Sequence, residues 1–194
     1  MLHYLCFGMK RLFAAIKIHP DEAFMRLYYA LKTGCKYDKI NWVKPENIHI
    51  TLKFFGETDP DLIPEINTRL NDLAQHHSAF SMVLKGTGVF GSFYKPRVLW
   101  LGIEDNPRLI ELGHEILEEM DSIGFKKDRQ NFVPHLSIGR IKLTDNKERF
   151  FDLVERYKKE HISNLKVDQF HLFESKLSSS GPSYSILNSF SLKT

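Results

Sequence analysis

The sequence predicts an α+β fold, on the strength of three observations. Several runs of strand length show alternating or continuous apolar residues, and neighbouring runs are close enough along the chain to form hairpins. Helical stretches with clear start signals lie between them, but strands and helices do not alternate one for one. That order favours α+β over a doubly wound parallel sheet. The two halves also share a coarse order of strand, helix, histidine-containing strand and helix, which indicates a weak internal duplication.

The individual elements follow from these local patterns. We expect strands at 11–18, 42–43, 47–57, 80–89, 96–103, 133–141, 165–175 and 183–192. We expect helices at 19–34, 59–76, 106–124 and 144–160. In the first helix, Pro20 is expected in the first turn and Gly34 at the end. The pairs Asp59-Pro60 and Asn106-Pro107 each place a capping residue before a proline at the first helical position.

Length and composition indicate one globular domain. The chain has 194 residues, enough for one large domain or for two small lobes that share a core. No apolar run approaches the roughly 20 residues that span a bilayer, and no long linker or low-complexity tract divides the sequence. We expect a single domain over 9–194, preceded by a leader at 1–8 of uncertain status, because Met9 is an alternative start.

The number of cysteines and the net charge indicate the cellular compartment and the charge of the substrate. Cys6 and Cys35 are too few for a disulfide framework and form no C-x-x-C pair, so we expect reduced thiols in a cytoplasmic protein. The formal net charge of +3 suits an anionic substrate. Lys and Arg are scattered along the chain, whereas a duplex-binding domain usually carries a denser basic stripe.

A short pattern of histidine and hydroxyl residues occurs twice in strand context. In HITL at 49–52, His49 and Thr51 share one face of a strand, because strand side chains alternate. HLSI at 135–138 repeats the arrangement with His135 and Ser137. Two further matches at 76–78 and 161–163 fall near predicted helix ends, outside alternating runs. The alternative interpretation is two half-exposed strands whose polar faces carry histidine.

Paired histidines and hydroxyls suit phosphodiester cleavage. The reaction needs a proton delivered to the leaving oxygen and a proton removed from water, and histidine with a pKa near 6.5 can do either. The hydroxyls of Thr51 and Ser137 can donate hydrogen bonds to the phosphate oxygens. Two such strands that face each other across a cleft would place one histidine on each side of phosphorus.

At this point the sequence resembles a known family, the two-histidine (2H) phosphoesterases. It looks like the bacterial and archaeal RNA 2′,3′-cyclic phosphodiesterases, historically called 2′-5′ RNA ligases. The resemblance covers nearly the whole chain, except the leader 1–8. Its segments are RLFAAI at 11–16, HITLKFFGE at 49–57, GVFGSFYKPRVLWLGI at 88–103, PHLSIGR at 134–140 and LFESKLSSSGPSYSIL at 172–187. Ser137 stands where threonine is commoner in the family, and it keeps the hydroxyl.

The resemblance implies a fold and an activity. The family fold is bilobal α+β, with two pseudo-symmetric antiparallel sheets, outer helices and a central cleft. The implied reaction opens a terminal 2′,3′-cyclic phosphate of RNA to a 2′-phosphate, with His49 as proton donor and His135 as proton acceptor. The implied substrates are RNA 3′ ends with a cyclic phosphate, or related small nucleotides. No metal or cofactor is expected, and we expect a monomer.

Several assignments stay open. Arg140 is either a phosphate contact or a surface arginine at a strand end. Phe54, Phe55 and Trp100 could stack a nucleobase, although aromatic residues in strands more often lie in the core. The reverse reaction, 2′-5′ RNA ligation, would use the same histidines. A module that binds RNA or nucleotides without turnover is the alternative outside the enzymes.

Overall fold

The computed structural model describes residues 8–126, 132–179 and 181–194. Within these residues, four α-helices and nine strands form an α+β fold, as the sequence predicts. The strands are β1 (Lys10–Lys17), β2 (Lys39–Trp42), β3 (His49–Thr58), β4 (Phe80–Gly91), β5 (Pro96–Ile103), β6 (His135–Leu143), β7 (His161–Val167), β8 (Gln169–Ser178) and β9 (Gly181–Ser191). The helices are α1 (Glu22–Gly34), α2 (Ile63–Ala74), α3 (Pro107–Ser122) and α4 (Lys147–Arg156), with short 3-10 turns at Pro45–Asn47 and Pro60–Leu62.

The described strands form two antiparallel halves that meet at one point. The strand order is β7-β4-β5-β6-β3-β1-β8-β9. Strand β2 pairs with residues 139–143 of β6. Between the halves, β3 and β6 share a single residue pair, Ile50 with Leu136. The two expected sheets are therefore hydrogen-bonded to each other through the two strands that carry the histidine motifs.

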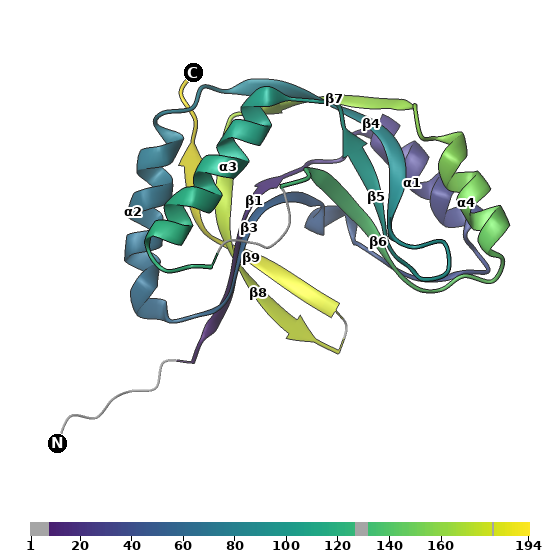
Figure 1. Ribbon diagram of the computed structural model, residues 1–194, viewed down its shortest axis with the longest axis horizontal. Helices are drawn as coiled ribbons and strands as arrows, with labels where there is room; N and C mark the ends of the chain where they lie inside the picture. The colour runs from purple at the N-terminus through teal and green to yellow at the C-terminus, as the bar shows by residue number, and fades with distance from the viewer. Residues whose placement is uncertain (1–7, 127–131, 180) are drawn as a thin grey trace.

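Each half of the sheet has its own pair of helices (Figure 1). We call β1, β3, β8 and β9 with α2 and α3 the first lobe, and β2, β4, β5, β6 and β7 with α1 and α4 the second lobe. Helix α1 follows β1 of the first lobe but packs against β7 and α4 of the second lobe. The chain thus crosses between the lobes, so neither lobe is a continuous segment.

Strand β1 shows why the first lobe has apolar residues on both faces of its sheet. Leu12, Ala14 and Ile16 point to the main core under the helices. Phe13 and Ala15 point the other way and form a small separate cluster with Phe173 of β8, which Tyr184 partly covers. The alternation of β1 therefore builds an aromatic wall on the helix-free face.

Side-chain caps fix the helix starts. Asp21 accepts a hydrogen bond from the Phe24 backbone N–H at 2.8 Å and another from the Ser163 hydroxyl of β7. The expectation of Pro20 in the first turn is therefore wrong, because the cap is Asp21 and Pro20 precedes it. Asn106 caps α3 by accepting from the Leu109 N–H at 3.1 Å, with Pro107 at the first helical position as predicted.

The prediction was also wrong between residues 144 and 175. The helix ends at Arg156, and 161–167 forms a separate strand, β7, that pairs with β4. Asp168 separates β7 from β8, so the single strand expected over 165–175 is two. Long-range pairing with β4 decides this segment, and local sequence does not contain that information.

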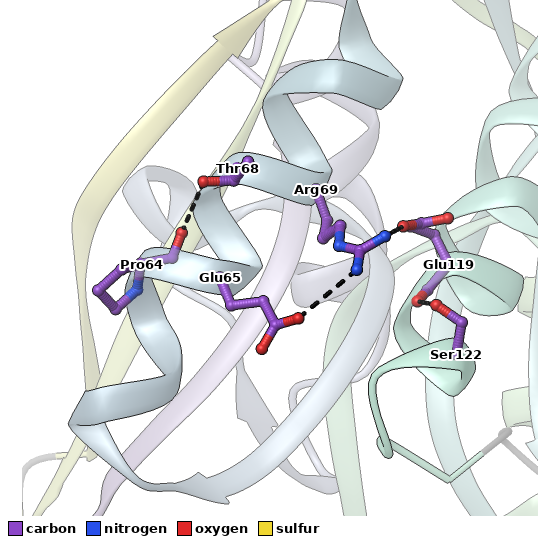
Figure 2. A network of polar contacts seen from close by, with 6 residues as sticks. All are labelled: Pro64, Glu65, Thr68, Arg69, Glu119 and Ser122. Atoms are coloured by element: carbon purple, nitrogen blue, oxygen red, sulfur yellow. Dashed lines mark hydrogen bonds and ion pairs between the residues drawn. The ribbon is translucent and has the colours of Figure 1, made fainter.

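A polar network joins the outer helices of the first lobe (Figure 2). Arg69 of α2 forms an ion pair with Glu119 of α3 at 2.9 Å and a longer one with Glu65 of its own helix at 3.6 Å. All three side chains are substantially exposed, so the network contributes on the order of 1 kcal/mol or less to stability.

Some expectations concern parts of the chain outside this description. The leader at 1–8 lies outside the described residues except for Gly8, and so does Cys6. Among the described helices, none has the length and apolar character to span a membrane.

Candidate active site

The two histidine motifs lie side by side where the lobes join. Because Ile50 and Leu136 are antiparallel partners, the same register aligns His49 with Ser137 and Thr51 with His135. Ile50 and Leu136 are fully buried on the helix side. The four polar residues alternate with buried ones and are half-buried on the opposite face. The structure thus brings together the histidines and hydroxyls singled out in the sequence.

Both histidines are held by the same type of contact, between Nδ1 and the backbone carbonyl two residues earlier. The Nδ1 atom of His49 lies 2.7 Å from the carbonyl oxygen of Asn47, and Nδ1 of His135 lies 2.8 Å from the carbonyl oxygen of Val133. A carbonyl only accepts, so each Nδ1 carries a proton and donates it. This fixes the tautomer of the neutral ring and leaves Nε2 for proton transfer.

The electrostatics show that residues of both lobes act on His49. Burial lowers the pKa of His49, the Asn47 carbonyl raises it, and the charges of His135 and then Arg140 lower it further. Burial also lowers the pKa of His135, against the Val133 carbonyl, which raises it. Both rings therefore favour the neutral form at neutral pH in the free protein.

Matching β-bulges follow the two motifs. Along β3, Ala14 pairs with Lys53 and Ala15 with Thr51, so Leu52 is an extra residue. Along β6, Leu99 pairs with Gly139 and Trp100 with Ser137, so Ile138 is the extra residue. A bulge shifts the alternation by one, and it re-aims the side chains that follow.

The bulges determine on which face of the sheet the side chains after each motif lie. Leu52 and Lys53 are both buried, and so are Ile138 and Gly139. The next residues, Phe54 and Arg140, consequently return to the face of the histidines and are exposed. The effect of the Arg140 charge on the pKa of His49 agrees with this placement.

Buried Lys53 connects the first motif strand to the chain before the second motif. Its Nζ donates to the backbone carbonyl of Lys126 at 2.7 Å. Strict alternation would have put this lysine on the outer face. Its inward position follows from the bulge at Leu52.

The three aromatic candidates for base stacking differ in position. Phe55 contacts Phe125 edge-on at 5.0 Å between ring centroids and packs against the main core. Trp100 packs on Phe90 at 5.3 Å, and the ring lies where a side chain on Gly88 would be. Phe54 is 56% exposed on the face of the histidines. Of the three, Phe54 has the exposed ring face on which a base could stack.

The sequence patterns did not indicate the aromatic neighbours of the histidines. Tyr184 of β9 meets the His49 ring edge-on at 5.4 Å, and Phe13 lies 4.9 Å from it. Phe90 meets His135 edge-on at 4.7 Å. The alternation in β1, β4 and β9 could have assigned these rings to a face, but only the pairing of distant strands places them beside the histidines.

The two remaining His-x-Ser matches serve other contacts. His77, in the match at 76–78, contacts Glu115 of α3 through Nε2 at 3.0 Å. His161 begins β7 and contacts Asn164 at 3.3 Å. Neither is at the junction of β3 and β6.

The chain has close relatives in sequence. The sequence model of the 2′-5′ RNA ligase superfamily matches residues 37–177. A protein of Methanocaldococcus jannaschii named RNA 2′,3′-cyclic phosphodiesterase is 37% identical over 177 residues, which cover 91% of this chain and 98% of the relative. A protein of Thermotoga maritima with the same name is 38% identical over 146 residues, which cover 75% of this chain and 76% of the relative.

Solved structures share the fold. The crystal structure of TT0787 of Thermus thermophilus gives a TM-score of 0.77 at 26% identity and covers 94% of this chain and 98% of that one. The structure of Escherichia coli LigT complexed with 3′-AMP gives a TM-score of 0.68 at 22% identity, with coverage of 96% and 99%.

The two lobes and the paired motifs at their junction define a two-histidine phosphoesterase fold. Within that class, the chain belongs to the 2′-5′ RNA ligase superfamily.

Proposed function

We propose that the protein hydrolyses the terminal 2′,3′-cyclic phosphate of RNA to a 2′-phosphate. The observation that carries the proposal is the pair of histidines, each held through Nδ1 by a backbone carbonyl and each with a hydroxyl residue two positions on. The names of the relatives support the same reaction, which is hydrolysis of a cyclic phosphodiester.

The histidines divide the proton transfers. The Nε2 of His135 takes a proton from water, whose oxygen forms a bond to phosphorus. The bond from phosphorus to the 3′ oxygen breaks, and His49 gives that oxygen its proton. The in-line geometry needs one histidine on each side of phosphorus, and the antiparallel junction of β3 and β6 supplies one from each lobe.

The acid must carry a proton although its surroundings disfavour the charge. Burial, His135 and Arg140 all lower the pKa of His49 in the free protein. The anionic phosphate opposes these effects, because an opposite charge nearby stabilises the imidazolium. Substrate binding therefore raises the pKa of His49 and prepares the general acid.

The hydroxyls and Arg140 bind the phosphate. Thr51 and Ser137 are aligned with the histidines of the opposite strand, so each hydroxyl can donate to a phosphate oxygen near the reacting centre. Arg140 follows on the same face and adds a positive charge with planar donors. The reaction as proposed needs no metal or cofactor.

The product of a defined substrate tests the proposal. An oligoribonucleotide ending in a 2′,3′-cyclic phosphate, incubated with the protein and EDTA, should yield a terminal 2′-phosphate. The variants His49→Ala and His135→Ala should lose this product while they remain folded by circular dichroism. A 3′-phosphate product would reverse the assignment of the leaving oxygen. Joining to a 5′-hydroxyl RNA without hydrolysis would make the protein a 2′-5′ ligase.

We also propose that residues 9–194 act as one bilobal domain, as a monomer in the cytoplasm. The crossing of the chain between the lobes at α1 supports a single folding unit. The free, buried thiol of Cys35 is consistent with a reducing compartment. Light scattering after size-exclusion chromatography tests the monomer, and a mass near twice 22.7 kDa would exclude it.

A further inference from the structure

A pocket of about 230 Å³ lies in the first lobe beside His49. His49 and Lys17 line it from adjacent strands, and they are direct cross-strand partners of β3 and β1. Lys17 continues the row of Phe13 and Ala15 on the helix-free face. The pocket thus has a proposed catalytic group and a cation on one face of the sheet.

The charge of Lys17 acts on a second histidine, His171. Burial, then Lys17, then His19 lower the pKa of His171 on β8. The charges that act on His49 are instead those of His135 and Arg140. The charge of Lys17 therefore acts on β8, while the residue lines the pocket beside His49.

Lys17 is available to a ligand. Across the described ranges 8–126, 132–179 and 181–194, Lys17 forms no ion pair or hydrogen bond through its side chain. Glu46 also lines the pocket, and its carboxylate would repel an anion, so Lys17 is the lining group with which an anion can pair. An anion therefore finds its favourable position at Lys17.

The walls between these groups suit a sugar. Tyr184 and Phe173 line the pocket, with the Tyr184 ring edge-on to His49. Asn47 adds a polar edge, and its side chain donates to the Pro182 carbonyl of β9 at 3.2 Å. At about 230 Å³, the pocket is smaller than the roughly 300–1,000 Å³ typical of drug-sized ligands. It has room for a part of a nucleotide and not for several nucleotides.

We propose that this pocket binds the terminal ribose of an RNA strand and that Lys17 contacts the phosphate on its 5′ side. The inference rests on the proposed function, which places the 2′,3′-cyclic phosphate at the histidines. One ribose separates that cyclic phosphate from the 5′ phosphate, and His49 and Lys17 line one pocket of a size that accepts a ribose. The preferred substrate class is then a strand end that carries a 5′ phosphate, over a bare nucleoside cyclic phosphate.

Two small substrates isolate the contact. Adenosine 2′,3′-cyclic phosphate and its 5′-phosphorylated form differ only in the group that Lys17 would bind. The ratio of their kcat/KM values should favour the 5′-phosphorylated form by about tenfold, as expected of one charge-assisted contact. In Lys17→Met, which keeps the length and removes the charge, the ratio should fall close to one. Lys17→Arg should retain most of the preference.

A matched control removes a lysine elsewhere. Lys158 is exposed beyond α4 and pairs with Glu155 at 2.6 Å, so Lys158→Met changes the net charge equally and should keep the wild-type ratio. Higher ionic strength should lower the ratio in the wild-type protein more than in Lys17→Met.

The outcomes separate the two proposals. If the wild-type protein hydrolyses both substrates equally well, or if Lys17→Met keeps the preference, the subsite is wrong and the proposed function stands. If folded wild-type protein hydrolyses neither these substrates nor a cyclic-phosphate oligonucleotide, the proposed function fails and the subsite fails with it.

Discussion

The strands that carry the two motifs share a backbone design and differ in their side chains. In both, a histidine donates through Nδ1 to the carbonyl two residues earlier, and a bulge follows at the fourth motif position. After the bulge, β3 presents Phe54 and β6 presents Arg140. The surroundings differ as well, since His49 has Phe13 and Tyr184 around it and His135 has Phe90.

This difference bears on the two chemical roles that we propose for the histidines. The carbonyl contact and the bulge orient a histidine and re-aim the side chain beyond it, whichever lobe they occur in. The charges around the two histidines then differ. Burial lowers the pKa of both histidines, their mutual repulsion has the same direction, and the charge of Arg140 lowers the pKa of His49 in addition. The lobes therefore supply two histidines in similar poses but different fields.

Replacement of either histidine should cause the largest loss of activity. His49→Ala and His135→Ala should each reduce kcat about 10²- to 10⁴-fold, since each removes one proton-transfer group. The double variant should be little worse than the more damaged single variant, because the groups act on one reaction step. Steady-state hydrolysis of adenosine 2′,3′-cyclic phosphate measures this. Full multiplication of the two losses would contradict a shared step.

Arg140→Met should reduce the electrostatic difference between the two histidines. We expect a roughly 10- to 100-fold loss of kcat/KM from the missing phosphate contact. Removal of the cation should also raise the pKa of His49 in the free protein, because Arg140 lowers it. An NMR titration of the imidazole resonances should show His49 protonating at higher pH and His135 nearly unmoved. If the pKa of His49 did not change in this variant, Arg140 could not lie near His49.

Phe54→Ala tests the residue that takes the place of Arg140 in the first lobe. A base stacked on Phe54 would contribute about 1–3 kcal/mol, so KM for a cyclic-phosphate oligonucleotide should rise about fivefold or more. Tyr94→Ala is the control, because Tyr94 is 82% exposed in the β4–β5 turn, away from the motifs. Equal effects of the two variants would argue against stacking at Phe54.

The histidines also predict how stability depends on pH. His49, His135 and His171 all have pKa values lowered by burial, so the unfolded chain binds more protons than the folded one. The free energy of unfolding should therefore fall as the pH drops below the unfolded value near 6.5. Urea unfolding at pH 7.5 and 5.5 measures the change. It should be smaller in a His49→Gln, His135→Gln variant, and an unchanged difference would contradict the lowered pKa values.

The smallest effect is expected far from the junction, at the network of Figure 2. Arg69→Met removes exposed ion pairs to Glu65 and Glu119 and should cost on the order of 1 kcal/mol or less. Thermal unfolding measures the loss, and hydrolysis should be unaffected. A large loss of stability would mean that the contact between α2 and α3 depends on this arginine.

Local signals in the sequence were sufficient for much of the fold and for the motif residues. Capping residues such as Asn106 gave helix starts, and the alternation of His49 and Thr51 with Ile50 gave their common face. The bulges at Leu52 and Ile138 could not be predicted, because a bulge is a mismatch between a strand and a partner distant in sequence. Simple alternation without these bulges would expose Lys53 and would place Arg140 on the face opposite to His135. The structure shows neither arrangement.

The most direct test of the division of roles uses a substrate with a better leaving group. In a nucleoside 2′,3′-cyclic phosphate with sulfur in place of the bridging 3′ oxygen, the departing thiolate needs no proton from a general acid. We expect that His49→Ala regains most of the wild-type rate on this substrate, whereas His135→Ala stays impaired because water still needs a base. Recovery in His135→Ala, or in neither variant, would contradict the assignment of His49 as the acid and His135 as the base.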